Sequence, residues 1–138
     1  MLLLLCALLF ALRGQLVGPA LERIVSQAMV ADVRDTLAPG LAVGVCGAGG
    51  PMPDPIRSGP CLVITAGENL LLVDAGTNGP RNLNRMQLPI GDVDAVLLTH
   101  FHSDHIDGLG ELGTLRWVSA ANTQPLPVIA PRGGEPVV

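Results

Sequence analysis

The sequence is poor in aromatic and basic side chains. Tyrosine and lysine are absent, aromatic residues make up 2% of the 138 residues, and all eight basic residues are arginine. Proteins that bind single-stranded nucleic acid stack bases on aromatic side chains, so the composition disfavours this class. Twelve acidic residues give a formal net charge of −4, which also disfavours binding to nucleic acid or anionic lipid through bulk charge.

Charged residues of either sign are also few, at 14%, whereas 49% of the chain is hydrophobic. A disordered chain lacks the apolar residues that offset the entropy lost on ordering, so this composition excludes one. The length is that of one domain. The sequence therefore predicts a single folded domain with a substantial core.

Cysteine is scarce, with Cys6, Cys46 and Cys61 as the only copies and no C-x-x-C pair. A small disulfide scaffold needs a denser and even set. Cys46 and Cys61 each lie in an apolar run of strand character. We expect both to be buried as small hydrophobic side chains, in preference to forming a disulfide.

The first twelve residues form an apolar run that is closed by Arg13. This run has the length of a signal-peptide core and is shorter than the roughly 20 residues of a membrane-spanning helix. No basic residue precedes it and no clear A-x-A site follows. We expect residues 1–18 to be an apolar leader, either a signal peptide or a membrane anchor, and the protein to be exported or membrane-anchored outside the cytoplasm. An ordinary core helix is the alternative.

The remaining chain changes its hydrophobic period near Gly40. Helical spacing of apolar residues predicts an amphipathic linker helix within residues 19–39, and residues 40–138 form the domain proper. Helices are expected at 80–87 and 105–118, with a hairpin turn at 67–69. Short apolar runs typical of strands occupy residues 41–46, 61–65, 70–74, 95–99 and 127–130. Helices between strands indicate a mixed α/β fold.

The glycine-rich loop from Gly47 to Pro60 does not fit a nucleotide-binding motif. Pro51, Pro53 and Pro55 prevent a helix from opening there, and no Gly-Lys-Ser/Thr sequence is present. We expect a rigid irregular loop that joins two strands, with Asp54 and Arg57 as its charged members. No G-x-S-x-G motif supports a serine hydrolase either.

All three histidines of the chain fall within six residues, at His100, His102 and His105, and Asp104 stands between the last two. Imidazole and carboxylate are the ligands that zinc and similar divalent ions prefer. In an extended segment, side chains two residues apart point the same way, so His100 and His102 would face one metal ion. Asp104 and His105 follow on a tighter turn, where they would face a second.

This H-x-H-x-D-H arrangement resembles the signature of the metallo-β-lactamase superfamily. The strand residues Leu71 to Gly76, which include an aspartate before Ala-Gly, and the Gly108-Leu109 pair after the motif agree with the resemblance. The loop from Gly47 to Pro60 is similar to the first loop of the ribonuclease Z and arylsulfatase-like branch. The resemblance implies a four-layer αβ/βα sandwich, of which this chain carries the N-terminal half.

The resemblance also implies the roles of individual residues. His100 and His102 would bind the first zinc ion, and Asp104 and His105 the second, while Asp104 would also act in catalysis by positioning a hydroxide or moving its proton. Asp74 and Thr99 would hold the ligand loop by hydrogen bonds from behind. Outside the motif, Trp117 is expected in the core, and Asp107 and Glu111 as solvated residues at the start of a helix.

The function implied for the intact protein is hydrolysis by a zinc-bound hydroxide, most simply of a small-molecule phosphodiester or sulfate ester. The family does not exclude nucleic acid, although the charge disfavours it. A lactone or β-lactam hydrolase on the same metals is one alternative. Because the downstream histidines and bridging aspartate of the family are not in the sequence, we interpret the chain as a fragment that is inactive alone. An inactive, truncated module tethered to a membrane through residues 1–12 is the remaining alternative.

Overall fold

The structure is a computed structural model that describes residues 17–19, 32–120 and 124–134. The chain divides into two compact units, Met1–Ala31 and Asp32–Val138, and the candidate site lies in the second. The leader at residues 1–12 and most of the expected linker helix lie outside the described residues. In the first unit, the structure describes residues 17–19, which are helical. Within the described ranges, no helix is long and apolar enough to cross a membrane.

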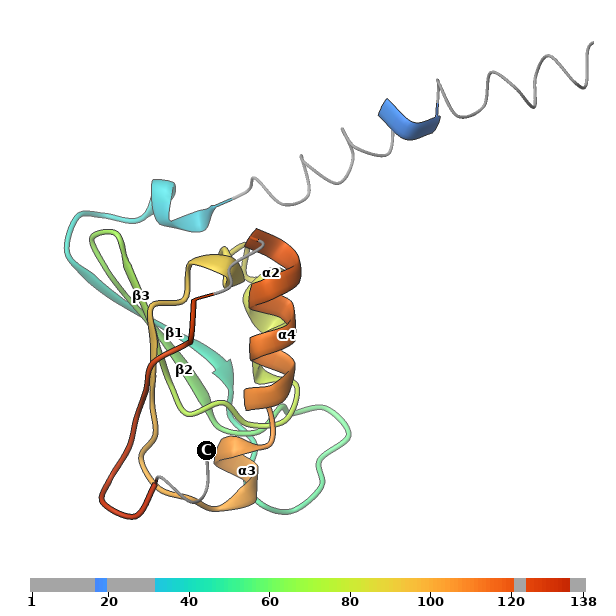
Figure 1. The fold of residues 1–138 in the computed structure, drawn as a ribbon, viewed down its shortest axis with the longest axis vertical. Coiled ribbons are helices and arrows are strands. Elements are labelled where there is room, and N and C mark those ends of the chain that lie inside the picture. The colour runs from blue at the N-terminus through green and yellow to red at the C-terminus, as the bar shows by residue number, and fades with distance from the viewer. Residues whose placement is uncertain (1–16, 20–31, 121–123, 135–138) are drawn as a thin grey trace, which may run out of the picture. The chain divides into compact units, whose positions relative to one another are not determined.

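The second unit is built on a five-stranded sheet in the order β1-β2-β3-β4-β5 (Figure 1). Strands β1, β2 and β3 are antiparallel neighbours, whereas β4 runs parallel to β3 and β5 runs parallel to β4. The strands are β1 (Leu41–Gly47), β2 (Cys61–Ala66), β3 (Asn69–Val73), β4 (Ala95–Leu97) and β5 (Val128–Ile129). All five lie where the sequence predicts them, although β4 and β5 are shorter than expected.

The turn between β2 and β3 confirms the predicted hairpin. Ala66 pairs with Asn69, which leaves Gly67 and Glu68 as a two-residue turn. Gly67 has a φ of 60°, a conformation that costs glycine least. The Asn69 side chain donates a hydrogen bond to the Ala66 carbonyl at 3.1 Å and closes the turn.

Helices cover one face of the sheet. Figure 1 shows α2 (Gly79–Arg85) and α4 (Leu109–Ala120) packed on the same side, and short helices η1 (Val33–Thr36), η2 (Ile90–Asp92) and α3 (Ser103–Ile106) complete the set. The core between these layers is aliphatic, with Leu70, Leu72, Leu83 and Leu112 fully buried. The mixed α/β prediction is therefore confirmed, and the described part forms two layers.

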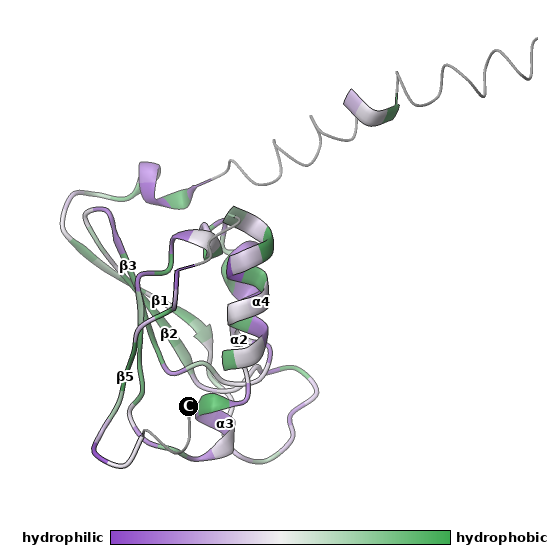
Figure 2. Ribbon diagram, viewed as in Figure 1, coloured by the Kyte–Doolittle hydropathy of each residue, from purple (hydrophilic) through white to green (hydrophobic). Residues whose placement is uncertain are grey.

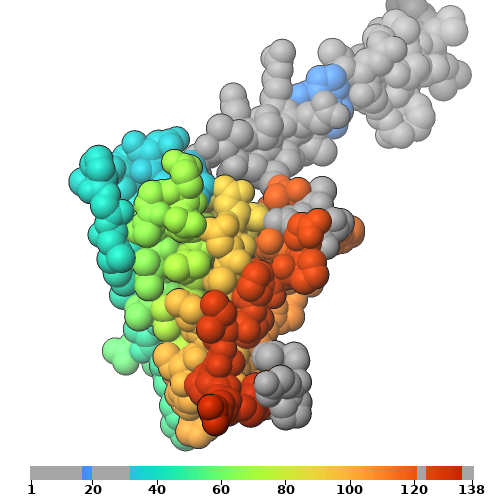
Figure 3. Space-filling model, turned by 60° about the vertical axis from the view of Figure 1, so that its left-hand side comes forward, coloured from blue at the N-terminus to red at the C-terminus, as the bar shows by residue number. Residues whose placement is uncertain are grey.

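The strands are rich in apolar residues (Figure 2), and some of these side chains lie on the other face of the sheet. Leu41, Val43 and Val45 alternate outward along β1 and are 57–71% exposed. Val43 pairs with Ile64, which in turn pairs with Leu71, so the apolar character continues across the sheet. Figure 3 shows the strands side by side from β1 at one edge towards β5 at the other, and no described helix covers this face.

The helix predicted at 105–118 is interrupted. It is divided into α3 and α4 at Gly108, whose N–H donates to the Ala75 carbonyl at 2.8 Å. A Cβ atom at Gly108 would lie 2.7 Å from the carbonyl oxygens of both Ala75 and Gly76, so the chain approaches here too closely for any other residue. Helical periodicity does not reveal this break, because the interruption comes from a contact with a distant loop.

One prediction about a single side chain in this region is wrong, and two are right only in part. Trp117 is 58% exposed, because α4 turns Leu112 and Arg116 inward and Trp117 lies off that face. Glu111 is in the first turn of α4, as expected, but forms an ion pair with Arg81. Asp107 is exposed but follows the end of α3, so it does not begin a helix.

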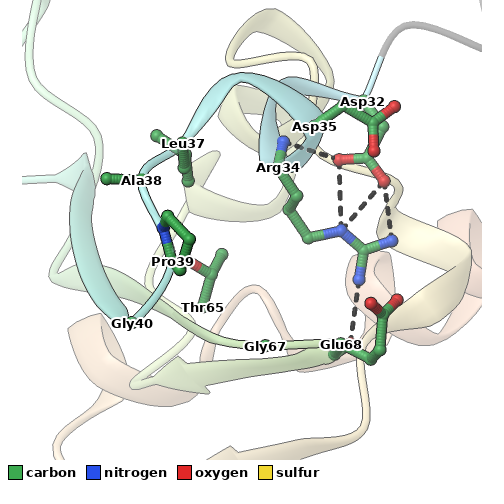
Figure 4. A pocket seen from close by; sticks show the side chains of 10 residues that line it. All are labelled: Asp32, Arg34, Asp35, Leu37, Ala38, Pro39, Gly40, Thr65, Gly67 and Glu68. Carbon is green, nitrogen blue, oxygen red and sulfur yellow. Dashed lines mark hydrogen bonds and ion pairs between the residues drawn. The ribbon is translucent and has the colours of Figure 1, made fainter.

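The domain begins with a partly buried ion pair at η1. Asp32 caps η1 by accepting the N–H of Arg34, and the two side chains form a salt bridge of 2.7 Å (Figure 4). Arg34 also pairs with Asp92 and donates to the Glu68 carbonyl, which holds η1 to the β2–β3 turn and to η2. The hydrogen bond from Arg34 lowers the pKa of Asp32, and Asp32 in turn raises the pKa of Arg34. Of the segment predicted as a linker helix, Val33–Thr36 form a single 3-10 turn, and Pro39 and Gly40 follow it.

Candidate metal centre

The site residues lie where two parallel strands end. β3 ends at Val73 and β4 ends at Leu97, two residues that pair with each other in the sheet. Since parallel strands have their carboxyl ends at the same edge, Asp74 and Thr99 leave this edge side by side. The H-x-H-x-D-H segment continues directly from Thr99 and places His102 at the N-cap of α3.

The three imidazoles form one cluster. The ring centroids of His100 and His102 are 4.6 Å apart, and those of His100 and His105 are 4.0 Å apart. Asp104 joins the cluster through its Oδ2 atom, which lies 3.6 Å from Nε2 of His105. The four predicted ligands are therefore brought together. His100 contacts both His102, its partner in the first predicted pair, and His105 of the second pair.

Asp74 supports this cluster from the interior. Its side chain is buried and accepts three hydrogen bonds of 2.8 Å, from the N–H and the hydroxyl of Thr99 and from Nδ1 of His105. Asp74 has a φ of 60°, which aspartate and asparagine adopt more readily than most residues. The carboxylate thus fixes both the start of the motif, at Thr99, and its last histidine.

Two of the three histidines have a polar partner at Nδ1, which leaves Nε2 for a ligand. Because Nδ1 of His105 donates to Asp74, its Nε2 atom is the one left for a ligand. Nδ1 of His100 lies 3.0 Å from the Thr99 hydroxyl, which leaves its Nε2 in the same way. A metal-binding histidine is oriented by a polar partner on its other nitrogen, so this arrangement fits a divalent metal.

The chemistry of the donor atoms fits zinc, but the described residues supply an incomplete set of ligands. Among the described residues, no three His, Cys, Asp or Glu side chains converge closely enough to hold a metal ion. A catalytic zinc typically has three protein ligands and one water. The residues fit the metal as partial ligand sets and do not enclose it.

A cavity of about 360 Å³ lies beside Asp104. Its wall includes the loop between β1 and β2, the residues after β3, and Ser103 and Asp107 of the α3 region. Within that loop, Oδ1 of Asp54 accepts the N–H groups of Ile56 and Arg57 at 2.8 Å each. The bond from the Arg57 N–H is the largest of the causes that lower the pKa of Asp54. The loop is irregular, as predicted, and the Asp54 side chain stabilises a turn within it.

The prediction that Cys46 and Cys61 do not form a disulfide is wrong. Both side chains are buried, as expected, but they are bonded to each other, with their Cα atoms 5.0 Å apart. A β-bulge sets both Cys46 and Gly47 opposite Cys61, which brings the two sulfur atoms to the same face. The signal available in the sequence was the position of the two cysteines on either side of one loop.

Comparison with known proteins agrees with this geometry. Residues 54–134 match the family model of the metallo-β-lactamase superfamily. The chain is 41% identical over 100 residues to ribonuclease Z of Mycobacterium bovis, an alignment that covers 71% of this chain and 36% of the relative. It is 40% identical over 100 residues to ribonuclease Z of Mycolicibacterium gilvum, with 71% and 35% covered. The chain thus spans about a third of the length of these relatives.

Solved structures give the same result. The short form of human tRNase Z superposes with a TM-score of 0.61 at 27% identity, covering 69% of this chain and 37% of that chain. The metallo-β-lactamase fold protein YhfI of Bacillus subtilis superposes with a TM-score of 0.62 at 27% identity, covering 70% and 40%. The family model includes every residue of the H-x-H-x-D-H cluster and the cavity wall from Asp54 onward. The chain belongs to the metallo-β-lactamase superfamily.

Proposed function

We propose that the protein is a zinc-dependent hydrolase that cleaves phosphodiester bonds in RNA, and that this chain supplies one part of its metal centre. The observation that carries the proposal is the cluster of three imidazoles and Asp104, with Asp74 bonded to His105 behind it. The relatives named ribonuclease Z support RNA as the substrate class.

In this proposal, His100 and His102 hold a first zinc ion, and Asp104 and His105 hold a second. When bound, zinc lowers the pKa of its water to near 7 and polarises the phosphoryl oxygen. Asp104 orients the attacking water and accepts its proton, while Asp74 and Thr99 keep the two histidine rings in place. The cavity, which is lined by Asp104, would give the substrate access to that carboxylate.

The acidic net charge does not oppose this proposal. A charge of −4 disfavours non-specific attraction to nucleic acid over the whole surface. A substrate held by a metal centre is attracted locally by the metal cations, which the formal charge of the chain omits. The composition therefore excludes a general nucleic-acid binder more firmly than it excludes an RNA-cleaving enzyme.

The test is a zinc titration followed by hydrolysis assays. We expect the wild-type protein to bind zinc, and to cleave bis(p-nitrophenyl) phosphate and a 3′-extended RNA when the part of the M. bovis relative that this chain does not match is added in trans. Aryl sulfate, lactone and β-lactam substrates measure the competing activities. If the protein binds zinc but turns over only an aryl sulfate, a lactone or a β-lactam, that substrate would replace RNA in the proposal. Absence of both zinc binding and turnover would favour the inactive interaction module.

We also propose that the protein is located outside the cytoplasm. The disulfide between Cys46 and Cys61 supports this, because disulfides persist mainly in oxidising compartments. Cells expressing the chain with and without residues 1–18 are fractionated, and the thiols are trapped with an alkylating reagent. Cytosolic recovery of both forms with free thiols would contradict the proposal.

A further inference from the structure

The disulfide closes the loop that packs against the metal motif. Cys46 and Cys61 are separated by 15 positions in the sequence and are 1% and 2% exposed. The bond joins the end of β1 to the start of β2, where the regular register of the two strands is lost at the bulge. It therefore fixes both ends of the loop at the point where strand pairing no longer does so.

Two hydrogen bonds lead from this point towards the metal motif. The Pro60 carbonyl, adjacent to Cys61, accepts the N–H of Gly76 at 2.9 Å, and the N–H of Gly59 donates to the Thr77 carbonyl at 2.9 Å. The next residue along, Ala75, donates its N–H to the carbonyl of His105 at 2.8 Å. A short run of backbone bonds thus connects Cys61 to His105.

The same segments touch Asp104 directly. A Cβ atom at Gly59 would lie 2.9 Å from the Asp104 carbonyl oxygen, and one at Gly76 would overlap that oxygen. Three backbone segments, from the loop, from the end of β3 and from α3, therefore meet without side chains between them. In such a contact, a displacement of the loop is passed to Asp104 because no flexible side chain absorbs it.

The disulfide also fixes the helix beneath this contact. A Cβ atom at Gly79 would lie 2.8 Å from Cβ of Cys61, so α2 begins against the disulfide itself. Nδ2 of Asn82 donates to the Cys46 carbonyl at 2.6 Å and to the Ser58 hydroxyl at 2.9 Å. The bulge, the loop and α2 are therefore held as one body.

We propose that Cys46 and Cys61, as a disulfide, are positioning residues that set the location of Asp104 and His105 in the metal centre. The inference depends on the proposed function for its consequence, since these two residues are assigned there as zinc ligands. Its structural content is independent of metal: breaking the disulfide loosens the backbone bonds of the motif more than those of the rest of the domain.

The experiment measures amide hydrogen exchange in the metal-free chain and zinc affinity by titration. The test variant is the double substitution Cys46→Ala and Cys61→Ala, which is used because the buried disulfide is shielded from reductants. A matched control is Val93→Ala, a fully buried side chain in the loop that follows η2, which lowers global stability by a different route. Urea concentrations are chosen so that both variants have equal free energies of unfolding.

At matched stability, we expect the amides of Ala75, Gly76 and Gly108 to exchange faster in the double variant than in the control, and zinc affinity to fall by about 10–100-fold. A second variant, Gly59→Ala, keeps the disulfide but forces the loop away from Asp104, and is expected to produce the same local pattern. Equal exchange in the double variant and the control would overturn the inference and leave the disulfide as a general stabiliser. If no protein binds zinc while the exchange pattern is as expected, the proposed function fails and the structural coupling stands.

Discussion

Asparagine in place of Asp74 should weaken the metal centre without disturbing the turn on which it stands. Asp74 has a positive φ, which asparagine also tolerates, so the substitution changes the carboxylate and little of the backbone energy. The amide oxygen can replace only one of the two carboxylate oxygens. The NH₂ group then faces the backbone N–H of Thr99 if it takes the Oδ1 position, or both the Thr99 hydroxyl and Nδ1 of His105 if it takes the Oδ2 position. At least one hydrogen bond to a buried charged group is lost, which costs about 1.5–3 kcal/mol of unfolding free energy.

Zinc affinity should fall in addition to the free energy of unfolding. Removal of the group that orients a metal-binding histidine reduces metal affinity by roughly 10–100-fold. The two quantities are measured separately, by urea denaturation of the metal-free protein and by zinc titration with a competing chelator. Asp94→Asn is the matched control, because Asp94 is also an aspartate that accepts a backbone N–H, that of Leu70 at 2.8 Å, at the opposite end of β3.

The control should change stability by less than about 1 kcal/mol and leave zinc affinity unchanged, since Asp94 is exposed. Unchanged zinc affinity in Asp74→Asn, or an equal loss in Asp94→Asn, would refute the reasoning. The first result would mean that His105 needs no partner at Nδ1. The second would mean that affinity follows global stability alone.

Three further predictions concern other side chains. His102→Ala should remove zinc binding at the first site and abolish turnover, yet change the unfolding free energy by no more than about 0.5 kcal/mol, because His102 is exposed; a folded variant that still turns over substrate would contradict the ligand assignment. Arg116→Met should destabilise the domain by about 1–3 kcal/mol, since buried Arg116 donates to the carbonyls of Val93 and Gln124, whereas exposed Arg85→Met should be near neutral in the same denaturation experiment. Arg34 lowers the pKa of Asp32 below its ordinary value of 3.8, so the stabilisation from this pair is complete above that pH and is lost as the pH falls through the lowered pKa. Asp32→Asn should therefore cost about 1–2 kcal/mol at pH 7 and progressively less in acid, as denaturation curves between pH 7 and 3 would show; a constant difference would contradict it.

The sequence predicts the elements of this fold well because most of them follow local patterns. The alternation in β1 and the turn residue Gly67 are local signals, and the structure has the strand and the hairpin where they are expected. The four members of the H-x-H-x-D-H cluster lie within six residues, so their meeting required only one loop. Such features depend on neighbours in the sequence.

The predictions that are wrong depend on contacts between distant residues. The division of the helix at Gly108 follows from its bond to Ala75, and the Cys46–Cys61 disulfide follows from a bulge that changes the register by one residue. Trp117 is exposed because a buried arginine, Arg116, takes the inward position beside it. From hydrophobicity alone, tryptophan is the residue expected to be buried at this position of the helix. The guanidinium of Arg116 is buried instead because it donates hydrogen bonds to the carbonyls of Val93 and Gln124.

The apolar outer face of the sheet has a consequence for measurements of stability. Leu41, Val43 and Val45 on β1, with Ile129 on β5, are each more than half exposed to solvent. Burying one such side chain contributes about 1.5–3 kcal/mol, whereas a whole domain is stable by only about 5–15 kcal/mol. Any layer that covers this face therefore adds an amount comparable with the stability of the domain itself. We therefore expect the melting temperature of this chain to depend on protein concentration and on any segment that is added to it. A single melting temperature would describe a mixture of associated and free chains, and not the fold alone.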